Sequence, residues 1–105
     1  MRASSDYAAD LSAAAIRDLR RIPGVGPRIA RDLLDLGVRS VAELDGADPD
    51  ALYQRIRALR GVHQDRCLLY VFRCAVYFAG PGPHEPGRLR WWAWKDAPAA
   101  TASEA

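Results

Sequence analysis

The sequence has little of what defines several classes of protein. It contains two cysteines in 105 residues, so it cannot be a small scaffold held together by disulfides. Its longest apolar run, Cys67 to Ala79, includes Arg73 and is shorter than the roughly 20 apolar residues of a membrane-spanning helix. Asp6 and Asp10 interrupt the N-terminal segment, where a secretory signal needs an unbroken apolar stretch. We therefore expect a cytoplasmic protein with free thiols and no membrane contact.

Lysine is nearly absent, because Lys95 is one of 15 basic residues and the others are arginines. The formal net charge is +2, but the charged residues are grouped in blocks of one sign along the chain. Residues 17–31 hold five arginines and one acid (+4), residues 32–50 hold six acids and one arginine (−5), and residues 55–73 hold five arginines and one acid (+4). Because arginine forms paired hydrogen bonds to phosphate, the two basic blocks are candidate anion-binding regions.

The composition is that of one folded domain, with 50% hydrophobic and 27% charged residues, which excludes wholesale disorder. The spacing of apolar residues predicts an all-α fold. We expect helices over about 13–22, 27–36 and 49–60, a short helical turn over 41–44, and a buried helix over 65–79. These make up a five-helix domain at residues 12–79. A flexible N-terminus (1–11), a linker with a Trp-rich segment packing on the domain (80–96) and a disordered tail (97–105) complete the chain.

Polar residues before the apolar runs suggest helix caps. Ser12 is expected to cap the first helix, and Ser40 with Glu43 matches a capping box for the short turn. Asp48 followed by Pro49 predicts the start of the next helix. Its apolar face is expected to consist of Leu52, Ile56 and Leu59.

A weak internal repeat relates two of the expected helix junctions. With a period of 37 residues, Gly24 falls on Gly61 and Val25 falls on Val62, whereas Gly26 falls on His63. The second copy is therefore degraded.

The first junction, Pro-Gly-Val-Gly-Pro over residues 23–27, resembles the turn of a helix-hairpin-helix motif. Glycines there expose backbone N–H groups at a helix N-terminus, where the helix dipole also favours an anion. The expected DNA-binding residues are Gly24, Val25, Gly26, Arg28 and Arg31, and the possible secondary contacts are Gly61, Val62, His63 and Arg66. Asp65 stands in the second copy where Arg28 stands in the first, so we expect one good phosphate contact. The alternative is a structural turn without a ligand.

The short capped turn over 40–44 also resembles the connector of tandem helix-hairpin-helix domains. More broadly, the chain resembles a family of small bacterial proteins, the pathogenicity-locus family, often labelled mitomycin-resistance proteins. The resemblance rests on the turn at 23–27 and on the stretches Ser-Val-Ala-Glu-Leu at 40–44, Asp65–Ala79 and Arg90–Asp96. It implies an all-helical fold that resembles DNA-binding domains and leaves the biochemical role open.

The remaining candidate residues can each have a functional or a structural role. His63, Cys67 and Cys74 form a stripe of potential metal ligands, but residues seven apart on one helix are too separated to share one ion. We therefore expect packed thiols and neither metal nor cofactor. Trp91, Trp92 and Trp94 lie among basic residues and could stack on bases, although packing on the helices is favoured.

These patterns predict a non-catalytic module that binds the DNA backbone without sequence preference, with a role in DNA repair or DNA-damage resistance. No nucleophile triad, phosphate-binding loop or carboxylate pair indicates an enzyme. The alternative function is a protein-interaction module or homodimer that uses the apolar surface of residues 70–78.

Overall fold

The computed structural model describes residues 2–61 and 64–95, with residues 2–10 as backbone only. Four α-helices are present in this part of the chain: α1 (Arg2–Leu19), α2 (Pro27–Asp35), α3 (Pro49–Arg60) and α4 (Arg66–Ala79). Three short 3-10 helices accompany them, namely η1 (Val41–Leu44), η2 (Pro86–Leu89) and η3 (Trp91–Trp94). No strand occurs in the described ranges, so the all-α prediction is confirmed.

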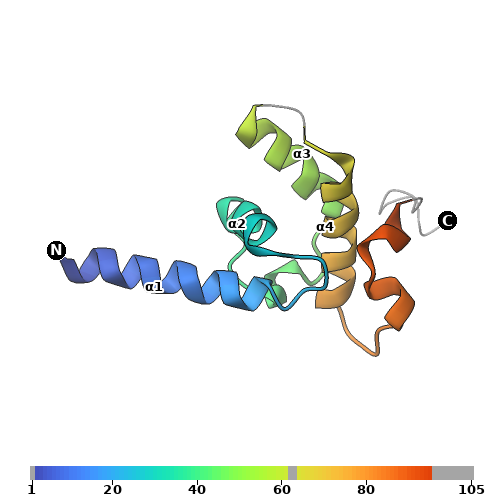
Figure 1. Cartoon of the computed structure of the whole chain (residues 1–105), viewed down its shortest axis with the longest axis horizontal. Coiled ribbons are helices and arrows are strands. Elements are labelled where there is room, and N and C mark those ends of the chain that lie inside the picture. Colours follow the sequence, from blue (N-terminus) through green and yellow to red (C-terminus); the bar gives the residue numbers. More distant parts are fainter. Residues whose placement is uncertain (1, 62–63, 96–105) are drawn as a thin grey trace.

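Helix α4 is the centre of the fold. Figure 1 shows α3, η1 and the C-terminal 3-10 helices grouped around it, while α1 extends outward. Most of α4 is buried from Leu68 to Ala75, as its nearly uniform apolar sequence predicts. The largest fully buried side chains are Leu19, Ile22, Leu33, Leu44, Ile56, Phe72 and Cys74. No helix in the described residues is long and apolar enough to cross a membrane.

The predicted start of the first helix is wrong. Helix α1 begins at Arg2, not near Ala13, and passes through Ser12 without a break. The segment expected to be a flexible N-terminus therefore has helical backbone from Arg2 onward. Alanine repeats through this stretch and has the highest helix propensity of any residue, which accounts for the extension.

The predicted capping box is also wrong. Residues 41–44 form a 3-10 helix, and the side chain of Ser40 makes no cap hydrogen bond. Instead, Asp18 of α1 accepts a hydrogen bond from the Val41 N–H at 2.8 Å, and Glu43 accepts one from the Arg39 N–H at 2.8 Å. A carboxylate distant in sequence thus takes the place of the local hydroxyl.

The N-cap of α3 is as predicted, but one residue predicted to lie on its buried apolar face is exposed. Asp48 accepts hydrogen bonds from the N–H groups at the start of the helix. Leu59 is 54% exposed, although the spacing assigns it to the core. Helix α3 packs against α4 with its earlier turns, and Leu59 lies beyond them at a shallow groove beside Leu36.

The C-terminal segment lies along α4. Trp91 packs against the hydrophobic core, and the Trp94 indole N–H donates to the Arg88 carbonyl at 2.9 Å. The Arg88 guanidinium lies over the Trp94 ring, 4.6 Å from its centroid. Arg73 of α4 donates to the Trp94 carbonyl at 3.0 Å. The predicted disordered tail, 97–105, lies outside the described residues.

Candidate nucleic-acid interface

The backbone of the turn between α1 and α2 requires a glycine at position 24. Gly24 has φ +87°, in the left-handed region, where a side chain is unfavourable. A Cβ on Gly24 would also lie 3.0 Å from Cδ1 of Trp91. Gly24 is therefore required by the turn and by its close contact with the C-terminal segment.

The second glycine of this turn has no such structural requirement. Gly26 is the N-cap residue of α2, with φ −94° and ψ −170°, an extended conformation open to any residue. A Cβ on Gly26 would meet nothing within 4 Å. Its missing side chain therefore leaves open space directly in front of the helix N-terminus.

The backbone donors at this N-terminus differ from the expected set. The Val25 N–H donates to the Ile22 carbonyl at 3.0 Å, and the Val25 side chain is buried, so Val25 is not a free donor. No side chain caps α2, and Pro27 has no N–H. In the described residues, the N–H groups of Gly26, Arg28 and Ile29 have no acceptor. These unsatisfied donors and the helix dipole favour an anion.

The two arginines predicted to accompany the turn are not equivalent. Arg28 is exposed, and it makes no ion pair with any described residue. Arg31 forms an exposed ion pair with Asp35 at 3.4 Å, which contributes little stability. Arg28 is consequently the available cation at the N-terminus of α2.

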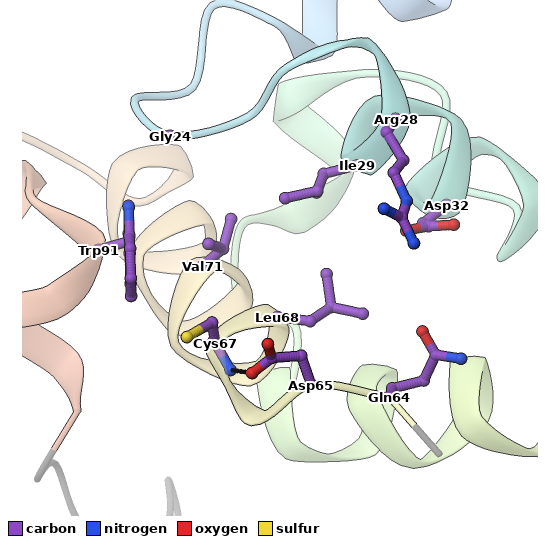
Figure 2. Close-up of a pocket in the computed structure, with 10 residues that line it drawn as sticks. All are labelled: Gly24, Arg28, Ile29, Asp32, Gln64, Asp65, Cys67, Leu68, Val71 and Trp91. Carbon is purple, nitrogen blue, oxygen red and sulfur yellow. Dashed lines mark hydrogen bonds between the residues drawn. The ribbon is translucent and has the colours of Figure 1, made fainter. Parts of the chain in front are cut away.

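A cleft of about 430 Å³ opens beside the turn (Figure 2). One wall comes from the first junction and α2, another from the chain before α4 and from α4 itself, and Trp91 closes a third side. The lining residues are Gly24, Arg28, Ile29, Asp32, Gln64, Asp65, Cys67, Leu68, Val71 and Trp91. The cleft combines an apolar floor with a polar rim.

The junction between α3 and α4 does not form a second site of the same kind. Gly61 has φ +71°, as Gly24 does, but α4 is capped by Asp65, which accepts from the Cys67 N–H at 2.9 Å. Arg66 does not line the cleft beside the first turn; its guanidinium lies 5.9 Å from the Tyr70 ring centroid. Val62 and His63, also predicted as secondary contacts, lie outside the described residues.

An ion-pair cluster that the sequence patterns did not reveal joins the end of α3 to α2, and its Asp32 also lines the cleft. Arg60, the last residue of α3, contacts Asp32 at 2.6 Å and Asp35 at 2.9 Å. Hydrogen bonds to these two carboxylates raise the pKa of Arg60. The alternating charge blocks in the sequence could have indicated this cluster, because it joins the acidic block (32–50) to the second basic block (55–73).

The two thiols occupy different surroundings. Burial raises the pKa of Cys74 to about 11, so this thiol stays protonated near neutral pH. Cys67 lines the cleft, and its pKa is raised by burial and by the neighbouring Asp65. Among the described residues, no three His, Cys, Asp or Glu side chains are grouped to hold a metal ion.

The comparisons with known proteins identify the family. The family model described as "Pathogenicity locus" (Cdd1) matches residues 12–99, and the chain therefore belongs to the pathogenicity-locus family, as its sequence predicts. It is similar to a protein named "Mitomycin resistance protein McrB" from Streptomyces lavendulae, with 36% identity over 75 residues. The match covers 71% of this chain and 68% of that protein. No solved structure matches the chain.

Proposed function

We propose that this protein is a non-catalytic DNA-binding module that holds the phosphate backbone at the turn between α1 and α2. The observation that carries the proposal is the uncapped N-terminus of α2, where Gly26 leaves open space and Arg28 makes no ion pair with a described residue. Backbone N–H groups and an arginine contact phosphates equally well in any sequence. The binding is therefore sequence-independent.

The wider features support the same proposal. The turn matches the helix-hairpin-helix pattern, and we take residues 12–79 as a tandem helix-hairpin-helix-like arrangement whose second hairpin is degenerate. A role in DNA repair or DNA-damage resistance is part of the proposal, and the name of the mitomycin-resistance relative favours it.

The test is a titration of a short fluorescent duplex, followed by anisotropy at about 50 mM and 150 mM salt. The wild-type protein is expected to bind and to lose affinity as salt rises. Gly26→Val is expected to weaken binding strongly while the protein remains folded, because φ at this position suits valine and the space is open. Gly87→Val, at another open glycine, is the matched control. No binding of the wild-type protein at 50 mM salt, or equal binding by the two variants, contradicts the proposal.

The charge of Arg28 is tested separately. Arg28→Gln is expected to weaken binding to every duplex and to lower the salt dependence by about one phosphate contact. Unchanged salt dependence would remove Arg28 from the site.

The alternative function, self-association through residues 70–78, loses the observation that suggested it. Val71 and Phe72 are buried within the fold, and Tyr70, Val76 and Phe78 are half-buried against the core. Among the described side chains, the large apolar ones that are exposed, Leu11, Leu59 and Trp92, belong to separate elements. Light scattering distinguishes the two functions, since a stable dimer that does not bind DNA would favour the alternative.

A further inference from the structure

A second cleft, of about 450 Å³, lies between α3 and α4. Its lining residues are Asp50, Tyr53, Gln54 and Arg57 from α3, with Arg66, Leu69 and Arg73 from α4. We refer to it as the arginine cleft. None of its residues lines the cleft beside the first turn.

The two clefts lie on opposite faces of α4. The cleft beside the turn uses Cys67, Leu68 and Val71, whereas the arginine cleft uses Arg66, Leu69 and Arg73. At about 100° per residue, the mean directions of these two sets differ by roughly half a turn of the helix. A phosphate group held at the first turn therefore cannot also occupy the arginine cleft.

Among the described residues, three arginines and one aspartate line the arginine cleft. Arg73 is 9% exposed and lies at its base, where it contacts Asp50 at 3.3 Å. Arg57 and Arg66 make no ion pair with the described residues. Like charges gathered in one cleft repel one another, so Arg57 and Arg66 favour the arrival of an anion.

Arg57 and Arg66, the two exposed arginines of the cleft, each lie near a tyrosine ring. The Arg57 guanidinium lies 5.8 Å from the Tyr53 ring centroid and donates to Gln54 Oε1 at 3.3 Å. Arg66 donates to the Tyr70 hydroxyl at 3.4 Å. These nearest partners are neutral, so they orient the guanidinium groups without forming an ion pair. The cleft thus presents positioned cations to an incoming anion.

We infer that the arginine cleft binds a phosphate-bearing anion, with Arg57 and Arg66 as its principal contacts. Guanidinium groups bind phosphate oxygens through paired hydrogen bonds. The phosphate belongs to one of two sources, a free oligophosphate or the backbone of a second DNA segment. This site is independent of phosphate binding at Gly26, so each can be tested without the other.

The first experiment is a titration of the ¹⁵N-labelled full-length protein with inorganic pyrophosphate, followed by amide chemical shifts. Shifts are expected at Gln54, Arg57 and Arg66. The double variant Arg57→Gln/Arg66→Gln is expected to lose about tenfold or more in affinity. Arg17→Gln/Arg39→Gln, which removes the same charge from exposed positions outside both clefts, is expected to bind as the wild type does. Circular dichroism verifies that both variants are folded.

The second experiment distinguishes the two sources by titrating a short duplex into the wild type, Gly26→Val and Arg57→Gln/Arg66→Gln. If a second DNA segment occupies the cleft, Gly26→Val retains a weak duplex interaction that perturbs Arg57 and Arg66. If the ligand is a free oligophosphate, duplex DNA leaves these amides unchanged while pyrophosphate shifts them. The inference is overturned if neither ligand perturbs the arginine cleft, or if the charge-matched control loses as much affinity as the double variant. Loss of duplex binding in Gly26→Val tests only the proposed phosphate site at the turn between α1 and α2, and does not bear on the arginine cleft.

Discussion

The two helix junctions share a backbone feature and differ in how the following helix begins. Each contains a glycine in the left-handed region, Gly24 at φ +87° and Gly61 at φ +71°. The N-cap residue of α2 is Gly26, which offers no side-chain cap. The N-cap residue of α4 is Asp65, whose carboxylate accepts a hydrogen bond from the Cys67 N–H.

This difference indicates which junction is available to an external anion. At α4 the protein supplies its own carboxylate, which satisfies a backbone donor and complements the helix dipole. At α2 the equivalent place is open. We conclude that the two junctions share a glycine in the left-handed region, while the N-cap residue determines whether a helix N-terminus can receive a phosphate.

The largest expected effect comes from giving the first junction the cap of the second. Gly26→Asp places a carboxylate where the phosphate is proposed to bind, so affinity for duplex DNA should fall about 100-fold, equivalent to losing an interaction of about 2–3 kcal/mol. The same variant should gain about 0.5 kcal/mol of stability, because aspartate is a good N-cap. Anisotropy and urea unfolding measure the two quantities.

Gly87→Asp is the control for this variant, since it adds the same charge at an open glycine away from the turn. A parallel loss of affinity in both variants would mean that net charge alone governs binding. Lower stability of Gly26→Asp would mean that the N-terminus of α2 is not open as described.

The second prediction compares the stability cost of substituting the two glycines with positive φ, Gly24 and Gly61. Gly24→Ala should destabilise the fold by about 2 kcal/mol, since it combines unfavourable backbone conformation with a Cβ 3.0 Å from Trp91. Gly61→Ala should cost about 1 kcal/mol, because a Cβ there meets nothing within 4 Å. Urea denaturation measures both.

The Trp91 contribution can be separated with a double-mutant cycle. In a Trp91→Ala background, Gly24→Ala should cost no more than Gly61→Ala does. Equal costs in the wild-type background would show that the close approach of Trp91 to Gly24 adds nothing.

The sequence was sufficient to predict the helices that have strong local signals. Asp48 with Pro49, the apolar stretch of α4 and the glycine turn at 23–27 all act through residues close together in the chain. The interactions that the sequence did not reveal join distant segments: Asp18 with Val41, Arg60 with Asp32, and Trp91 with Gly24. A capping pattern at Ser40 could not show that a carboxylate 22 positions earlier takes its role.

The candidate site was predictable in part for the same reason. The turn and Arg28 are adjacent in sequence, and a pattern suffices to select them. The occupied N–H of Val25 and the open space in front of Gly26 depend on backbone conformation, which the pattern does not specify. The arginine cleft draws on two helices, so no local spacing identifies it.

The third effect concerns the cap of α4. Asp65→Ala should destabilise the protein by about 1 kcal/mol, whereas Asp65→Asn should retain most of the cap. Because Asp65 also lines the cleft beside the first turn, Asp65→Asn should bind duplex DNA a few-fold more tightly. Thermal unfolding and anisotropy provide the readouts. Weaker DNA binding by Asp65→Asn would show that this carboxylate does not oppose the phosphate.

The smallest expected effect is on the pH dependence of stability. It compares Asp18, which links η1 to the end of α1, with an aspartate that has no such role. The hydrogen bond from the Val41 N–H, followed by the one from Arg21, lowers the pKa of Asp18. A lowered folded-state pKa means that the stabilisation is present above about pH 4 and is lost as the pH falls through the folded-state pKa. Asp18→Asn, which has no carboxylate to protonate, should therefore lose less thermal stability between pH 7 and pH 3 than the wild type does. Asp45→Asn, which removes an exposed carboxylate elsewhere in the fold, is the control. If both variants follow the wild-type curve, the contact between Asp18 and Val41 does not contribute to acid unfolding.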